Sequence, residues 1–205
     1  MDVMSDYSIG ESIARIPDLV KKAKSLNMRA LALTDRTLAE AIEFYLLCKT
    51  NNIKPIIGQK IAFGNNEVNL LCKDFDAYKI LCRHSLEFQE ANEFPMAVTK
   101  LPLTKEECEH FICLTPYCDA ELTELFGDNL YKEVDFADVK NHPEKLEKPD
   151  TSHAVIVNPV RYIEKEDYEA LAAFKQNISE NPTPTYPDNY FADDSEIIPF
   201  LRKCT

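Results

Sequence analysis

The densest group of possible metal ligands in this sequence is a cysteine and histidine cluster in the middle of the chain. It consists of Cys108, His110, Cys113 and Cys118. Thiolates and imidazoles are the side chains that hold zinc in proteins. The cluster lacks the Cys-x-x-Cys pair of structural zinc sites, and Cys113 falls inside an apolar run that is typical of a buried strand. We therefore expect these side chains to be structural.

Other common catalytic patterns are missing from the sequence. Ser8 and Ser85 have no evident histidine and aspartate partners of the kind that activate a serine nucleophile. The sequence contains neither a Walker loop nor a Gly-x-Gly-x-x-Gly loop for binding phosphates. Any site must therefore be assembled by the fold from residues that are distant in the sequence.

Apolar runs and helical periodicities alternate along the chain. Short apolar runs predict buried strands at residues 30–33, 54–58, 68–72, 111–114, 131–136 and 154–157. Apolar residues at helical spacing predict helices over residues 16–26, 41–48, 76–88, 120–126 and 166–178. Capping boxes are predicted at Thr37–Glu40 and Thr104–Glu107, and the polar stretch 138–152 is predicted to be a loop. This alternation favours an α/β fold with a parallel sheet, open or closed into a barrel.

Ligands of such folds bind beyond the carboxyl ends of the strands. Thr34 and Asp35 follow one predicted strand at this position. Five segments around it resemble the polymerase and histidinol phosphatase (PHP) domain, closest to that of the bacterial DNA polymerase III alpha subunit. They are Ser5–Ser8, Ile16–Lys24, Ala30–Asp35, Ala41–Tyr45 and Ile53–Gly58, with weaker matches continuing to Glu196.

The resemblance implies a single domain with a distorted seven-stranded α/β barrel, of the (β/α)7 type. It also implies that histidine and acidic side chains at the barrel mouth bind up to three divalent metals, which activate water for phosphoester chemistry. We predict that residues 1–180 form this PHP domain. Residues 181–205 are predicted to be a proline-rich linker and a short C-terminal helix that packs on the barrel.

The sequence departs from the family pattern at most of the metal-binding positions. Asp2 and Met4 stand where the family has a His-x-His pair, and Arg36 replaces the histidine of Thr-Asp-His after the retained Asp35. Lys60 replaces the glutamate of Gly-x-Glu. In the late Asn-Asp-x-His motif, Pro159 and Arg161 replace the aspartate and the histidine.

Three cationic side chains thus stand where a metal cluster would lie. Arginine stays protonated in proteins and cannot ligate a metal, and fixed positive charges repel a divalent ion. We therefore expect no metal, no cofactor and no catalysis. Either the cations pair with Asp2 and Asp35 in an ion-pair network, or they form a pocket for a phosphate or nucleotide. A residual phosphoesterase that uses Asp2 and Asp35 with one metal is the remaining alternative.

The net charge of −12 opposes binding to nucleic acid, which depends on neutralising phosphates with lysine and arginine. We therefore expect the partner to be another protein, of the replication or repair machinery that the resemblance implies. The first residues lack the basic and apolar regions of a secretion signal, and no apolar stretch approaches the length of a membrane span. Seven cysteines, mostly in apolar segments, fit reduced thiols in the cytoplasm.

Overall fold

Strands and helices alternate along most of the chain. The computed structural model describes residues 2–63, 66–93, 100–141, 153–179, 182, 184–193 and 196. Its strands are β1 (Asp2–Val3), β2 (Ala30–Leu33), β3 (Lys54–Phe63), β4 (Asn66–Cys72), β5 (Phe111–Thr115), β6 (Leu130–Asp135), β7 (Ala154–Val157) and β8 (Pro159–Val160). Its helices are α1 (Ile16–Ser25), α2 (Ala41–Thr50), α3 (Phe75–Arg83), α4 (Ser85–Glu93), α5 (Lys105–Cys108), α6 (Ala120–Phe126), α7 (Phe136–Asn141) and α8 (Tyr168–Ile178), with short 3-10 turns at Gly127–Asn129 and Lys165–Asp167.

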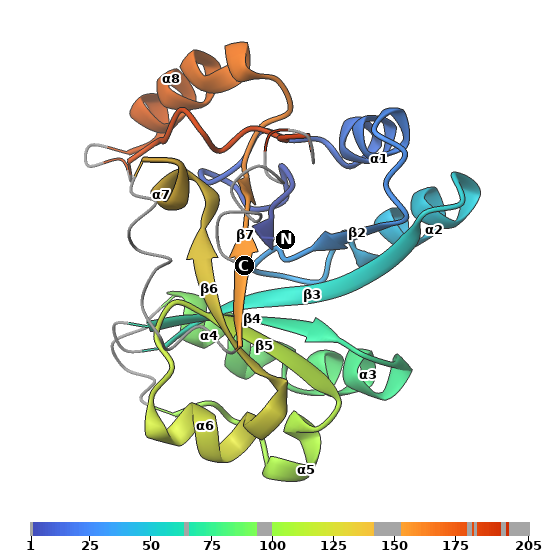
Figure 1. Cartoon of the computed structure of the whole chain (residues 1–205), viewed down its shortest axis with the longest axis vertical. Helices are drawn as coiled ribbons and strands as arrows, with labels where there is room; N and C mark the ends of the chain where they lie inside the picture. The colour runs from blue at the N-terminus through green and yellow to red at the C-terminus, as the bar shows by residue number, and fades with distance from the viewer. Residues whose placement is uncertain are drawn as a thin grey trace.

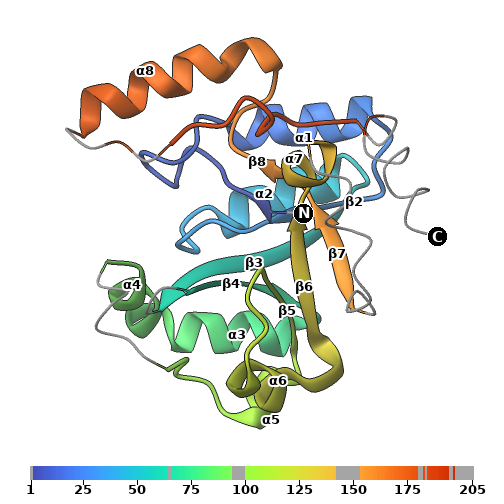
Figure 2. The same cartoon turned by 60° about the vertical axis from the view of Figure 1, so that its left-hand side comes forward.

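The strands form a curled sheet that closes on itself (Figures 1 and 2). Six strands are hydrogen-bonded in the order β2-β3-β4-β5-β6-β7, and β1 pairs with β8, which follows β7 after Asn158. The ring is completed where the backbone N–H of Thr34, just after β2, donates to the carbonyl of Val3 at 2.7 Å. With β7 and β8 counted as one interrupted strand, the described ring has seven strands, which confirms the distorted barrel.

The sheet is mixed, so the prediction of a parallel sheet is wrong for one strand. β4 runs antiparallel to both β3 and β5, whereas the pairs β2–β3, β5–β6 and β6–β7 are parallel. An apolar run has the same appearance in either direction, so the sequence pattern could not reveal the reversal. Gly58 lies where β3 changes partner from β2 to β4. A Cβ atom there would come within 2.7 Å of the Leu70 carbonyl oxygen, so this close approach requires glycine.

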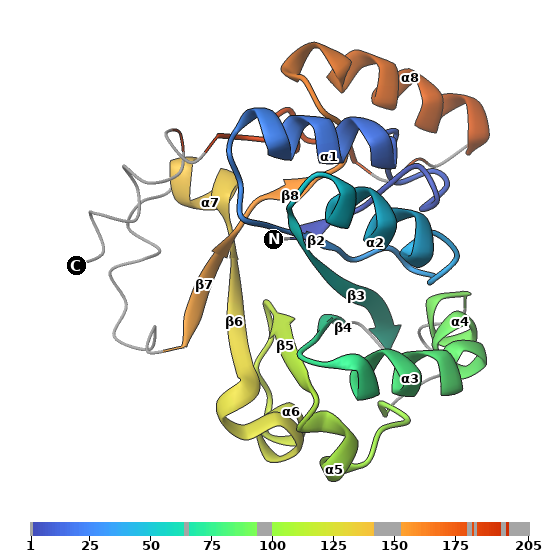
Figure 3. The same cartoon turned by 90° about the vertical axis from the view of Figure 1, so that its right-hand side faces the viewer.

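Helices α1 to α6 cover the outside of the barrel in two groups (Figure 3). Helices α1 and α2 pack against β1, β2 and β8, and α1 buries the stripe Ile16, Leu19, Val20 and Ala23 with Pro17 in its first turn. Helices α3 to α6 share a second core with β3, β4 and β5, in which Leu70, Phe88 and Phe111 are fully buried. Burial of these apolar side chains is the main stabilising contribution to the barrel wall.

Several predicted element boundaries differ from the structure. The Thr37–Glu40 capping box does not form, because the Thr37 hydroxyl contacts the Glu40 carboxylate and α2 starts only at Ala41. The predicted helix 76–88 is two helices that meet at His84. The first residues of the predicted loop 138–152 belong to α7, and its residues 142–152 lie outside the described part. The Thr104–Glu107 capping box is confirmed.

The described residues near the C-terminus pack on the barrel. Tyr190, Phe191 and Ala192 are buried, Tyr162 forms a β-bridge with Tyr190, and the Asn158 amide donates to the Tyr190 carbonyl at 2.9 Å. Most of the predicted C-terminal helix lies outside the described residues, and the division at residue 180 stays a prediction. Among the described helices, none has the length and apolar character needed to span a membrane.

Candidate functional site at the barrel mouth

A polar cavity of about 410 Å³ opens at one end of the barrel, and we call it the mouth. Five of the seven positions singled out in the sequence line it: Asp2, Arg36, Lys60, Pro159 and Arg161. Further side chains line it that were not singled out, namely Glu11, Glu67, Asn69, Pro116, Glu133, Asp135, Lys175, Pro184, Tyr186 and Asn189. The fold therefore gathers residues from both ends of the sequence around one cavity.

Strand alternation directs polar side chains into the mouth. On β4, Glu67 and Asn69 face the cavity while Val68 and Leu70 pack into the core beneath α3. On β6, Glu133 and Asp135 occupy the same face two residues apart. This period of two is the signal of a strand with one polar face, and it could have indicated these acidic residues in advance.

Asp2 is the most heavily paired charge in the mouth. Its Oδ2 accepts from Lys60 Nζ at 2.6 Å and from Arg161 Nη2 at 2.9 Å, while its Oδ1 accepts from the Thr34 hydroxyl at 3.2 Å. Asp2 is 2% exposed. Burial alone would raise the pKa of Asp2, but the charges of Arg161 and Lys60 outweigh it and hold that pKa well below its usual range.

Arg36 extends the pairing across the cavity. Its guanidinium binds the Glu11 carboxylate, and its Nη2 also donates to Glu67 Oε1 at 2.7 Å. Glu67 Oε2 lies 4.0 Å from Lys60 Nζ. Burial opposes the charged form of Arg36, but the two glutamates raise its pKa overall. The result is a continuous chain of alternating charges, in the order Glu11, Arg36, Glu67, Lys60, Asp2 and Arg161.

Asp35 and Met4 do not line the mouth. Asp35 is fully buried and accepts from the Ser5 backbone N–H at 2.7 Å, the Ser5 hydroxyl at 2.7 Å and the Ser8 hydroxyl at 2.5 Å. Within the described part of the chain it has no ion pair, so the ion-pair network of the mouth includes Asp2 but not Asp35. Burial raises the pKa of Asp35 despite the serine hydrogen bonds. Met4 is completely buried.

The remaining acidic side chains of the mouth, Glu133 and Asp135, both lie near the charge of Asp2. Burial and the nearby Asp2 raise the pKa of Glu133, which accepts from the Asn69 amide at 2.9 Å. Burial also raises the pKa of Asp135, which accepts from the Ala137 backbone N–H at 2.7 Å. Both carboxyl groups therefore bind a proton more readily than they would in water.

The mouth does not fit the metal cluster that the resemblance implies. A divalent ion requires several carboxylates or neutral imidazoles with free lone pairs. Here, Asp2 is bound by two cations, and Arg36 binds the two glutamates that face it. Within the described ranges, no group of three or more histidine, cysteine, aspartate or glutamate side chains could hold a metal ion, and this includes the cysteine and histidine cluster around Cys113.

Comparisons with known proteins agree with the fold. The family model described as PHP domain matches residues 1–148. The DNA polymerase III subunit alpha of Chlamydia muridarum is 30% identical over 174 residues, which cover 70% of this chain and 14% of that protein. The same subunit of Halalkalibacterium halodurans is 49% identical over 59 residues, 28% of this chain and 5% of the relative. This chain thus corresponds to a small part of the polymerase subunits that it matches.

A crystal structure from Bifidobacterium adolescentis, whose description proposes a metal-dependent phosphoesterase, superposes on 100% of this chain and 96% of its own. The sequence identity is 13% and the TM-score is 0.42. The family assignment comes from the match over residues 1–148, which covers most of the chain and includes the strands β1 to β6. The chain belongs to the PHP domain family.

Proposed function

We infer that this chain is a non-catalytic PHP domain that serves as a scaffold or interaction module. The observation that carries the proposal is the double pairing of Asp2 with Lys60 and Arg161. These cations stand at positions where the resemblance places a metal-ligating glutamate and histidine. Because each cation already has a buried carboxylate partner, the charges stabilise the folded mouth rather than waiting for a ligand.

The neighbourhood that we propose is DNA replication or repair, since the matched relatives are DNA polymerase III alpha subunits. The partner would be another protein rather than nucleic acid. The net charge of −12 repels phosphates, and the mouth arginines Arg36 and Arg161 are neutralised by Glu11, Glu67 and Asp2. For the same reason, an anion pocket for phosphate or nucleotide has weak support, because an anion would have to displace these carboxylates.

A residual metal-dependent phosphoesterase remains the second candidate. One observation favours it: Asn69 Oδ1 is buried and has no hydrogen-bond partner among the described residues, although Asn69 lines the same cavity as Glu133 and Asp135. The possible ligands Asn69, Glu133 and Asp135 differ from the pair that the sequence suggested, Asp2 and Asp35. Asp35 does not line the cavity. Lys60 lies within the same mouth and opposes a cation there.

Metal analysis with a phosphoesterase assay separates the two candidates. The purified chain would be equilibrated with Mn²⁺ or Zn²⁺, desalted and analysed for bound metal, and hydrolysis of bis(p-nitrophenyl) phosphate would be followed with and without chelator. We expect far less than one metal per chain and no hydrolysis that chelator removes. One tightly bound ion together with chelator-sensitive hydrolysis would refute the non-catalytic assignment.

Restoring the family ligands provides the positive control. The variant would combine Asp2→His, Met4→His, Arg36→His, Lys60→Glu, Pro159→Asp and Arg161→His, with folding checked by circular dichroism. If the replacements are what excludes metal, the restored chain binds a divalent ion that the wild type does not. A folded restored chain that still binds no metal would show that other features of the mouth exclude the ion.

A further inference from the structure

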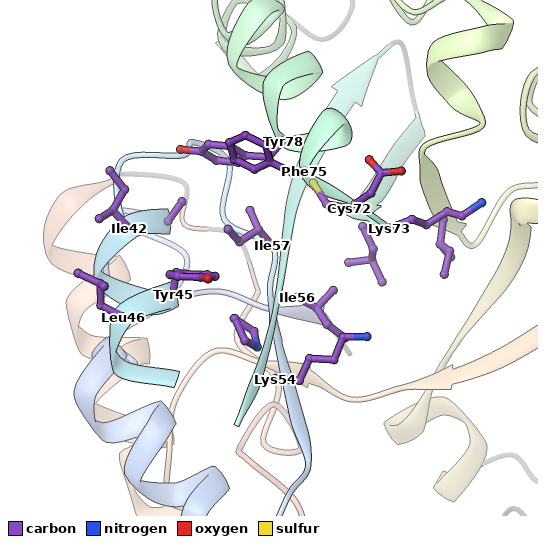
Figure 4. Close-up of a pocket in the computed structure, with 15 residues that line it drawn as sticks. Ile42, Tyr45, Leu46, Lys54, Ile56, Ile57, Cys72, Lys73, Phe75 and Tyr78 are labelled. Carbon is purple, nitrogen blue, oxygen red and sulfur yellow. The ribbon is translucent and has the colours of Figure 1, made fainter. Parts of the chain in front are cut away.

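A second cavity, of about 750 Å³, lies on the outside of the barrel between α2 and α3 (Figure 4). We call it the α2–α3 groove. Ile42, Tyr45 and Leu46 of α2 form one wall and Phe75 and Tyr78 of α3 another, around Ile56 and Ile57 of β3. Its lining is thus mostly aliphatic and aromatic, unlike that of the mouth.

The helix α2 exposes several large apolar side chains to solvent. It buries Ala41, Phe44 and Cys48 toward the barrel, yet its outer face carries Ile42, Tyr45 and Leu46, which are 68%, 43% and 58% exposed. Phe75 across the groove is 69% exposed. A helix that is apolar on all sides is normally buried. A contiguous exposed apolar patch of this kind marks a binding surface.

The floor of the groove is also incompletely paired. β3 pairs with β2 along Lys54–Ile57, but its pairing with β4 begins only at Gly58 and Leu71. Pro55 lies on this half of β3 and has no N–H group to donate to a neighbouring strand. The sheet therefore opens at the groove, which leaves room for inserted side chains between β3 and the end of β4.

Lysines surround the groove. Lys54 and Lys73 line it, Lys49 Nζ lies 5.6 Å from the centre of the Tyr45 ring, and Lys79 Nζ lies 5.1 Å from the centre of the Phe75 ring. Among the described residues, no carboxylate lies within ion-pair distance of Lys49, Lys54 or Lys73. Lys73 donates to two neutral oxygens, Glu109 O and Asn129 Oδ1. A basic rim is notable in a chain of net charge −12.

The acidic residues of the rim are already occupied. Asp74 accepts from the Ala77 backbone N–H and pairs with His110 at 2.8 Å, and Asp76 pairs with Lys79 at 2.6 Å. The rim thus offers a partner three lysines that no carboxylate among the described residues pairs, around an apolar centre. This combination complements a negatively charged segment with apolar anchors, because opposite charges guide the encounter and buried anchors supply the affinity.

We propose that the α2–α3 groove binds an acidic segment of another protein, which inserts apolar side chains between α2 and α3. The inference deepens the proposed function, since it gives the interaction module its surface and the chemistry of its partner. It does not depend on the mouth being free of metal. Metal analysis of the mouth and peptide binding at the groove can therefore fail independently.

Selection from a random-peptide phage library on the full chain tests the proposal. The Ile42→Glu variant serves for counter-selection. We expect the enriched peptides to combine net negative charge with several large apolar residues. Their binding would be measured by fluorescence anisotropy of labelled synthetic copies. Ile42→Glu should weaken binding by about tenfold or more, because it places a charge in the apolar centre.

Two further variants keep the test specific. Ile9→Glu changes an isoleucine that is 81% exposed and outside the groove, and it should bind like the wild type. The double variant Lys54→Glu with Lys73→Glu should weaken acidic peptides by about tenfold and reduce the salt dependence of binding. Enrichment of neutral or basic peptides, no enrichment, or equal binding by Ile42→Glu would overturn the proposal. So would a wild-type dimer in sedimentation that Ile42→Glu dissociates, since a second copy would then fill the groove.

Discussion

The mouth and the α2–α3 groove are built on the same strands with opposite chemistry. β3 contributes Lys60 to the mouth and Lys54–Ile57 to the groove, and β4 contributes Glu67 to the mouth and Leu71 to the groove. The cations of the mouth pair with its carboxylates. The groove instead exposes apolar side chains inside a rim where Lys49, Lys54 and Lys73 have no carboxylate partner among the described residues.

The contrast separates two ways in which a barrel can use a cavity. In the mouth, the buried charge of Asp2 is tolerated because Lys60 and Arg161 both pair with it. In the groove, exposed apolar surface and positive charge remain to be matched from outside. If this difference is correct, changes to single charges in the mouth alter stability, and changes in the groove alter binding alone.

The largest effect should come from breaking the Asp2 cluster. Asp2→Ala leaves Lys60 and Arg161 buried without their shared carboxylate, and we expect it to lower the free energy of unfolding by about 3–5 kcal/mol. Urea denaturation followed by circular dichroism measures the change. The exposed pair Lys22–Glu164 provides the control, because Glu164→Ala should cost less than about 1 kcal/mol. Equal losses for the two variants would show that the mouth pairing has no special role.

The next largest loss of stability is expected at Gly58, where β3 passes from the α2–α3 groove to the mouth. Gly58→Ala places a methyl group 2.7 Å from the Leu70 carbonyl oxygen and 2.8 Å from Leu71 Cδ2. We expect a loss of about 2–3 kcal/mol in unfolding free energy, because the backbone of β4 must move. Adding Leu71→Ala removes only the side-chain contact, so it should not restore stability. Rescue by this second change would mean that the backbone approach is not limiting.

A smaller, pH-dependent effect is expected at Glu40, the buried residue immediately before α2. Burial and the neighbouring Asp35 raise the pKa of Glu40 to about 8, from an ordinary value of 4.5. The folded state therefore holds this proton more tightly than the unfolded state does. The resulting stability is complete below about pH 4.5 and is lost as the pH rises toward 8.

Glu40→Gln removes this titration. Relative to the wild type, the variant should gain about 2 kcal/mol in unfolding free energy between pH 4 and pH 6, because each pH unit above the unfolded pKa costs the wild type about 1.4 kcal/mol. The unfolding free energy of the variant should still fall with rising pH, because the pKa values of Asp35, Glu133 and Asp135 are also raised. Glu43→Gln on the exposed face of α2 controls for the removal of one glutamate from the same region. If the unfolding free energy of Glu40→Gln and of the wild type changed with pH in the same way, the raised pKa of Glu40 would be contradicted.

Much of the fold and a third of the residues that line the mouth could be predicted from the sequence. Continuous apolar runs located β2, β5 and β7, and the spacing of Leu19, Val20 and Ala23 located α1, because burial imposes these patterns directly. The reversal of β4 has no such pattern. The hydrogen bonds of Asp35 could not be predicted, because its partners Ser5 and Ser8 lie in a loop whose path depends on tertiary contacts.

The pairing within the mouth also depended on residues that sequence motifs did not indicate. Glu11 lies in a loop, and its contact with Arg36 joins positions 25 residues apart. The alternation of Glu67 with Val68 and Asn69 with Leu70 was visible, but only the barrel shows which face is inside. The groove was missed because exposed apolar residues on α2 have the same sequence pattern as buried ones.

The smallest effect on stability is expected in the groove, where it completes the contrast with the mouth. Leu46→Glu puts a carboxylate on a side chain that is 58% exposed and near the lysine rim, so unfolding free energy should change by less than about 0.5 kcal/mol. Phe44→Glu on the buried face of the same helix is the matched comparison and should prevent folding or cost several kcal/mol, at least about 3. Thermal and urea denaturation of both variants measure the difference. A large loss in Leu46→Glu would mean that Leu46 supports the fold itself, and the groove would then be part of the core rather than a surface kept open for a partner.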